Sequence, residues 1–133
     1  MKITVSRHVI PAPWWRLLAW LGVIIVLCLS LVPLQVPAQL AFWNSDKLVH
    51  AGMYASLMLC FGRGYRRQYW LGIAFALAGL GLAIEFLQSL TPTRQASLLD
   101  ECANASGIVI MLWVLLRAPA TAAAPLDIEQ KHS

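Results

Sequence analysis

Hydrophobic residues fall into four long blocks along the chain, not into short alternating runs. The blocks cover about residues 17–34, 46–61, 69–90 and 98–116. An α-helix of about 20 apolar residues crosses a hydrocarbon core of about 30 Å. The block at 46–61 begins with three polar groups in five residues and is the weakest span on hydropathy alone. The pattern predicts an all-α protein with four transmembrane helices.

Composition agrees with this pattern. The 133 residues are 59% hydrophobic and only 12% charged, with a mean hydropathy of +0.67, whereas a soluble domain averages roughly 25% charged residues. We therefore expect one polytopic membrane unit at 17–117. A nucleic-acid-binding role would need basic residues gathered on a soluble face, and the sequence contains no such face. Cys28, Cys60 and Cys102 occur singly and are expected to pack as small hydrophobes.

The first block also has features of a signal peptide. A basic start precedes it, and the small-residue pattern Val36-Pro37-Ala38 follows it. Its run of about 18 apolar residues is longer than the core of roughly 7 to 15 residues in a signal peptide. The rest of the chain is also membrane-like, so we favour a retained helix.

Lysine and arginine are divided unequally between the two sides of the predicted helices. Eight lie on one side and two on the other. The eight are Lys2, Arg7, Arg16, Arg63, Arg66, Arg67, Arg117 and Lys131, and the two are Lys47 and Arg94. The positive-inside rule then places both termini in the cytoplasm. Residues 1–16 are expected to form a basic cytoplasmic tail and residues 118–133 a disordered one.

The other polar residues of the blocks concentrate at the opposite, outward ends. Helical spacing places them in one stripe on each of three helices. The stripes consist of Asp46, His50 and Tyr54 in the second block, Glu85 and Gln88 in the third, and Asp100, Asn104 and Gly107 in the fourth, with Lys47 and Arg94 beside them. Ionisable groups are costly in lipid, so we expect the stripes to face one another in a polar cup. Glu85 and Asp100 would pair there with Arg94, Lys47 and His50.

Several of these residues also have purely structural explanations. Asp46 follows Ser45 and fits a first-turn acid on the helix dipole, Ser97 to Asp100 fits a capping box, and Lys47 could snorkel to the interface. Glu85 is harder to explain. It lies about one and a half turns inside its helix, where no cap accounts for it and the helix C-terminus disfavours an acid.

Two further groups of residues bear on helix packing and on metal binding. Gly72, Gly79 and Gly81 are expected to be contacts that let a neighbouring helix approach closely. His50, Glu85 and Asp100 offer one imidazole and two carboxylates, which can bind a divalent ion. No local ligand spacing supports a metal there, and Lys47 and Arg94 oppose a cation. We expect neither a metal nor a cofactor.

The ordered combination DKxxHxxxY from Asp46, EFxQ from Glu85, Arg94 and DxxxNxxG from Asp100 resembles the VanZ-like family of small bacterial membrane proteins. The resemblance covers about residues 46–116, and the first helix contributes hydrophobicity only. The family is named for a member associated with low-level resistance to the glycopeptide teicoplanin. The resemblance implies a multi-pass protein of the bacterial inner membrane that acts in the cell envelope, near cell-wall precursors or in a glycopeptide-antibiotic response.

Three functions are consistent with the sequence. In the leading one, the outward-facing cup binds a polar or phosphate-bearing head group of an envelope lipid or a cell-wall precursor. The second is a membrane enzyme in which Glu85 or His50 is the general acid or base on an envelope lipid. In the third, the polar network only stabilises the bundle or docks a protein partner. Besides the lipid bilayer, the sequence indicates no particular protein partner.

Overall fold

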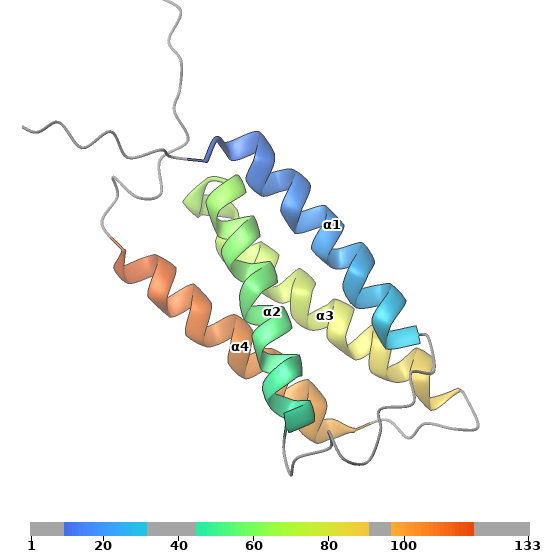
Figure 1. Cartoon of the computed structure of the whole chain (residues 1–133). Helices are drawn as coiled ribbons and strands as arrows, with labels where there is room; N and C mark the ends of the chain where they lie inside the picture. The colour runs from blue at the N-terminus through green and yellow to red at the C-terminus, as the bar shows by residue number, and fades with distance from the viewer. Residues whose placement is uncertain (1–9, 32–44, 91–96, 119–133) are drawn as a thin grey trace, which may run out of the picture.

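A computed structural model describes residues 10–31, 45–90 and 97–118. In these residues the chain forms four α-helices: α1 (Ala12–Leu31), α2 (Ser45–Gly64), α3 (Trp70–Ser89) and α4 (Leu98–Arg117). A short 3-10 turn, η2 (Arg67–Tyr69), links α2 to α3. The described part contains no strand. The predicted all-helical fold with four helices is confirmed (Figure 1).

The first helix begins earlier than the sequence pattern predicted. It starts at Ala12 instead of residue 17, so residues 12–16 belong to α1 and not to a tail. Pro13 lies in the first turn, where a proline removes no intrahelical hydrogen bond and its fixed φ suits the helix. Residues 32–34 and the tail at 119–133 lie outside the described residues.

Three helical segments of the described chain are long and apolar enough to cross a membrane. They are Ala12–Leu31, Arg67–Ser89 and Leu98–Arg117. α2 is not among them, and it is the helix that begins with Asp46 and Lys47 and includes His50. All four helices expose large apolar side chains, among them Trp20, Leu48, Phe75 and Trp113. Such a surface is expected where lipid replaces water, so the structure supports a membrane protein.

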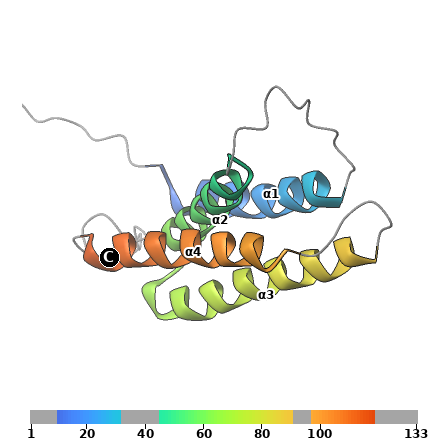
Figure 2. The same cartoon turned by 90° about the horizontal axis from the view of Figure 1, so that it is seen from below.

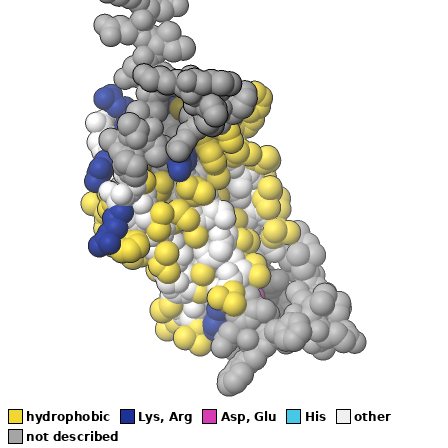
Figure 3. Space-filling model, turned by 60° about the vertical axis from the view of Figure 1, so that its left-hand side comes forward, with side chains coloured by type: hydrophobic (Ala, Val, Ile, Leu, Met, Phe, Trp, Pro, Cys, Tyr) yellow, Lys and Arg dark blue, Asp and Glu magenta, His cyan; other side chains and the backbone are white. Residues whose placement is uncertain are grey.

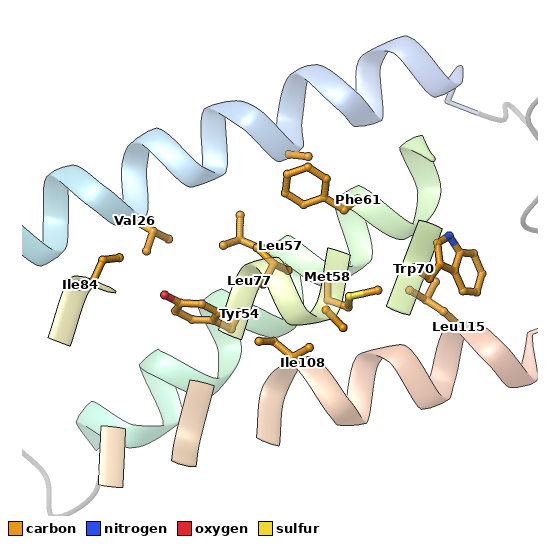
Figure 4. Packing of buried hydrophobic residues seen from close by; sticks show 12 residues of the cluster. Val26, Tyr54, Leu57, Met58, Phe61, Trp70, Leu77, Ile84, Ile108 and Leu115 are labelled. Carbon is orange, nitrogen blue, oxygen red and sulfur yellow. The ribbon is translucent and has the colours of Figure 1, made fainter. Parts of the chain in front are cut away.

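The four helices form a bundle in which α2 lies between α1 and α4 (Figure 1), and α3 covers α4 from below when the bundle is turned (Figure 2). Buried side chains from all the helices meet in the centre, with Tyr54, Met58 and Trp70 the largest that are fully buried. Figure 4 shows Leu57 and Met58 of α2 packed in one cluster with Leu77 of α3 and Ile108 of α4.

α2 and α4 approach each other closely because Gly107 has no side chain. A Cβ atom at this position would collide with the backbone carbonyl of Ala51 in α2. This close approach brings the first turns of the two helices side by side, so that polar residues near both N-termini can meet.

The two ends of the bundle differ in charge. We call the end where α1 and α3 finish and α2 and α4 begin the polar end, and the opposite end the basic end. All four acids of the described residues lie at the polar end: Asp46, Glu85, Asp100 and Glu101. The basic end carries Arg16, Arg63, Arg66, Arg67 and Arg117. Figure 3 shows basic side chains gathered at one end of the visible face, with a smaller group near the other end.

Candidate functional site

The polar end contains an ion pair between α2 and α4. Lys47 Nζ lies 3.5 Å from Asp100 Oδ1, and the two side chains are 35% and 16% exposed. Asp100 Oδ1 is itself fully buried and has no hydrogen-bond partner among the described residues. The contact is therefore electrostatic, without the alignment of a hydrogen bond. The buried Oδ1 of Asp100 can therefore still accept a hydrogen bond.

His50 is held by a chain of side-chain contacts that reaches into the bundle. Its Nδ1 lies 3.2 Å from Asn104 Oδ1, and Asn104 Nδ2 donates to Glu101 Oε2 at 3.2 Å. Because the amide nitrogen of Asn104 faces Glu101, its oxygen faces His50, and Nδ1 must carry the proton. His50 Nε2 then points toward Asp46 Oδ1, 3.8 Å away. Asn104, only 2% exposed, thus sets the orientation of the imidazole.

Glu85 connects the end of α3 to the start of α4. Its Oε2 accepts a hydrogen bond of 2.9 Å from the backbone N–H of Ser97, the N-cap residue of α4. Glu85 is 7% exposed. The interpretation that no cap accounts for this acid is wrong, because its carboxylate caps a helix other than its own. A negative charge is disfavoured at the end of α3 but favoured beside the N-terminus of α4.

The expected capping box at Ser97 is confirmed in one of its two hydrogen bonds. Ser97 Oγ accepts from Asp100 N at 3.3 Å. In a complete box the acid at the third helical position reaches back to the N-cap N–H. Here Glu85 takes that N–H, so the carboxylate of Asp100 is free to pair with Lys47 of α2.

Gln88 lies one turn beyond Glu85 and reaches the first helix. Its Nε2 donates to the backbone carbonyl of Ser30 at 2.7 Å, in a buried contact. Ser30 is next to last in α1, where carbonyls have no intrahelical partner. The first helix therefore contributes a backbone acceptor to the buried polar groups. Gln88 connects α3 to α1.

Tyr54 lies deepest in the stripe on α2. It is 2% exposed, and its hydroxyl has no hydrogen-bond partner among the described residues. In Figure 4 the hydroxyl points toward the same end of the bundle as Ile84. The buried polar groups therefore extend inward from His50 by one helical turn.

Glu101 is the residue of this network that the sequence analysis missed. It lies three residues before Asn104, a spacing that puts both on one helical face. Gly81 of α3 packs against this pair, and a Cβ there would lie 2.5 Å from Glu101 Oε2. The expected role of Gly81 as a packing contact is confirmed. For Gly72 and Gly79 it is wrong within this chain, because a Cβ at either position would meet nothing within 4 Å.

The site thus has two layers. The inner layer is buried and consists of Tyr54, Glu85, Gln88 and Asn104, with Glu101 at its edge. The outer layer is partly exposed and consists of Asp46, Lys47, His50 and Asp100. Arg94, also expected in this site, lies outside the described residues.

One group of side chains in the outer layer has the composition of a metal site. One ligand atom from each of Asp46, His50 and Asp100 lies within 4.8 Å of the other two. The grouping differs from the set considered from the sequence, because Asp46 takes the place of Glu85. A divalent ion at this point would compete with Lys47 for Asp100, so the ammonium group already supplies one positive charge to the carboxylates.

Comparison of the chain with protein-family models, with curated proteins and with solved structures finds no match.

Proposed function

We propose that this chain is a VanZ-like protein of the bacterial inner membrane, with four membrane-spanning helices and both termini in the cytoplasm. The polar end would then face outward, and its outer layer would bind the polar head group of an envelope lipid or a cell-wall precursor. The charge division between the two ends supports this orientation, because five arginines lie at the basic end of the described residues and one lysine at the polar end.

The observation that carries the proposal is the incomplete pairing of Asp100. A buried carboxylate oxygen with no hydrogen bond is costly, and its satisfaction is favourable. Lys47, on the other side of the pair, is 35% exposed and has three N–H donors. A ligand that enters between them can therefore donate to Asp100 and accept from Lys47 without dismantling the inner layer.

The described charges favour one kind of head group. The carboxylates of Asp46 and Asp100 accept hydrogen bonds. Among the outer-layer side chains, Lys47 is the one cationic donor whose charge does not depend on the protonation of an imidazole. Hydroxyl and amine groups donate to carboxylates, whereas a phosphate would be repelled by them. We propose a head group rich in hydroxyl or amine groups, such as a sugar. Recognition of a phosphate on the same molecule would fall to Lys47 and Arg94.

The inner layer supports a structural role for part of the predicted site. Glu85 and Gln88 each bond to a backbone group at the end of a neighbouring helix. Glu85 is therefore less suited to general acid–base catalysis than the more accessible His50. We assign these two residues to holding α1, α3 and α4 in place around the outer layer.

Native mass spectrometry of the full chain released from bacterial membranes tests the proposal. The wild type is expected to retain a lipid or precursor with a hydroxyl- or amine-rich head group, and Asp100→Asn and Lys47→Met are expected to lose it. Ser106→Ala is the control, because this exposed α4 hydroxyl bonds only to Ala103 of its own helix. Retention of the same molecule by the wild type and both variants would overturn the proposal.

A further inference from the structure

A groove opens at the basic end of the described structure, well away from the polar site. It has a volume of about 840 Å³ and lies between α1 and α3, within the range of roughly 300–1,000 Å³ typical of ligand sites. Its walls are almost entirely apolar. Trp20, Phe61, Tyr65, Tyr69 and Leu77 are among the residues that line it.

The shape of the groove depends on a missing side chain. Gly72 lines it, and a Cβ at this position would meet nothing within 4 Å. Any larger residue would extend into the hollow. Gly79, two turns further along α3, is equally open but does not line the groove.

Aromatic residues line the end of the groove nearest the connection between α2 and α3, and Arg16 lies against one of them. Trp20 Nε1 donates to Tyr65 Oη at 3.1 Å, a hydrogen bond that joins α1 to the connection between α2 and α3. The guanidinium of Arg16 lies 5.2 Å from the centre of the Tyr65 ring, and its Nε donates to Gly64 O at 2.8 Å. This bond uses one of the five N–H donors of an arginine, so Arg16 is fixed in place with four donors to offer.

Three arginines at this end, Arg16, Arg66 and Arg67, lie apart from the acids of the described residues. All three are exposed, and they take no part in the ion pairs of Lys47 with Asp100 and of His50 with Asp46. All four described acids lie at the polar end. An apolar groove that opens beside these three arginines is complementary to a molecule with an apolar chain and an anionic head.

We propose that this groove binds an anionic phospholipid. One acyl chain would lie along Trp20, Gly72 and Leu77, and the phosphate would be bound by Arg16 with Arg66 and Arg67 beside it. Arginine suits this role because its planar fork matches the geometry of phosphate oxygens. Basic pockets between membrane helices on the cytoplasmic side bind anionic head groups in this way. The assignment to the cytoplasmic leaflet rests on the proposed topology, but the groove itself does not depend on the proposed function of the polar end.

The test uses the full chain in nanodiscs with equal amounts of phosphatidylglycerol and phosphatidylcholine of the same acyl chains. The lipids that stay bound to the released protein are counted by native mass spectrometry. The wild type is expected to retain phosphatidylglycerol preferentially, and Arg66→Gln to reduce that preference about fivefold, the typical contribution of one basic residue near an anionic surface. Arg16→Gln should reduce it at least as much.

Matched variants separate the groove from its surroundings. Gly72→Leu is expected to remove most of the retained lipid, whereas Gly79→Leu on the same helix should retain as much as the wild type. Arg117→Gln is the charge control, because this arginine is at the basic end but stacks on Trp113 of α4. Equal retention of the two lipids by the wild type would overturn the proposal. Undiminished lipid retention by Gly72→Leu would also overturn it. The same holds if the wild type forms a dimer without bound lipid and Gly72→Leu abolishes that dimer.

Discussion

The carboxylate of Glu85 accepts a hydrogen bond from the backbone N–H of Ser97, 2.9 Å away. This bond joins the last turn and a half of α3 to the N-cap of α4. It places an acid where the dipole of α4 favours it, and it leaves Asp100 available to α2. A single hydrogen bond thus determines which residue of α4 faces Lys47.

Removal of the Glu85 carboxylate is expected to destabilise the bundle. Glu85→Ala should lower the free energy of unfolding by about 1.5 to 3 kcal/mol, the usual size of a hydrogen bond to a charged group. Glu85→Gln keeps an acceptor oxygen and should cost roughly half as much. Reversible unfolding in mixed detergent micelles measures both. Equal costs for the two substitutions would show that Ser97 does not depend on the acceptor at position 85.

Asn104 is expected to act through both of its side-chain contacts. Asn104→Ala leaves His50 Nδ1 and Glu101 Oε2 without their partner, and should cost about 1 to 3 kcal/mol because both groups lie in a partly buried region. In a double-mutant cycle with His50→Ala, the coupling energy is expected to be about 0.5 to 2 kcal/mol. Strictly additive effects would contradict the contact between His50 and Asn104.

Substitution by Ala is expected to change the stability of the bundle in opposite directions at Gly107 of α4 and at Gly79 of α3. Gly107→Ala adds a Cβ that would collide with the carbonyl of Ala51, so α2 and α4 must separate and the bundle should lose stability. A Cβ at position 79 would meet nothing within 4 Å. Gly79→Ala should therefore stabilise the helix by up to about 1 kcal/mol, because Ala has a higher helix propensity than Gly. Unfolding of the two variants under identical conditions provides the comparison. A Gly107→Ala variant as stable as the wild type would contradict the close approach.

The sequence indicated the four helices and the polar end for clear physical reasons. Apolar blocks of helical length and the separation of arginines from acids are properties of the residues themselves. Spacing of three and four residues also identified the faces of α2, α3 and α4 that carry Asp46, Glu85 and Asn104. These predictions need only the geometry of one helix at a time.

The partners within the site could not be predicted in the same way. Glu85 and Gln88 bond to backbone groups, and side-chain patterns contain no information about which N–H or carbonyl a neighbouring helix presents. Glu101 was missed because it adjoins Asp100 in a first turn where acids are common. Its role depends on Gly81, and that contact is set by how α3 crosses α4. The start of α1 was placed too late because tryptophans and Arg16 were interpreted as an interface.

The proposed topology gives the last prediction, because α2 alone does not have the composition of a spanning helix. If α2 crosses the membrane with the others, the first turn of α2 lies outside and the turn before α3 lies inside. In a background with Cys28, Cys60 and Cys102 replaced by Ala, Lys47→Cys should react with a membrane-impermeant maleimide in intact cells. Arg66→Cys should react only after the membrane is opened.

The control for this labelling is Leu57→Cys, in the buried middle of α2, which should stay unreactive in both conditions. Labelling of both Lys47→Cys and Arg66→Cys from the same side would mean that α2 does not cross. In the structure α2 runs parallel to α4 and shares the bundle core with it over most of its length. If only α1, α3 and α4 crossed the membrane, α2 could not keep this position, and Lys47 could not pair with Asp100. The expected outcome is therefore opposite accessibility at the two ends of α2.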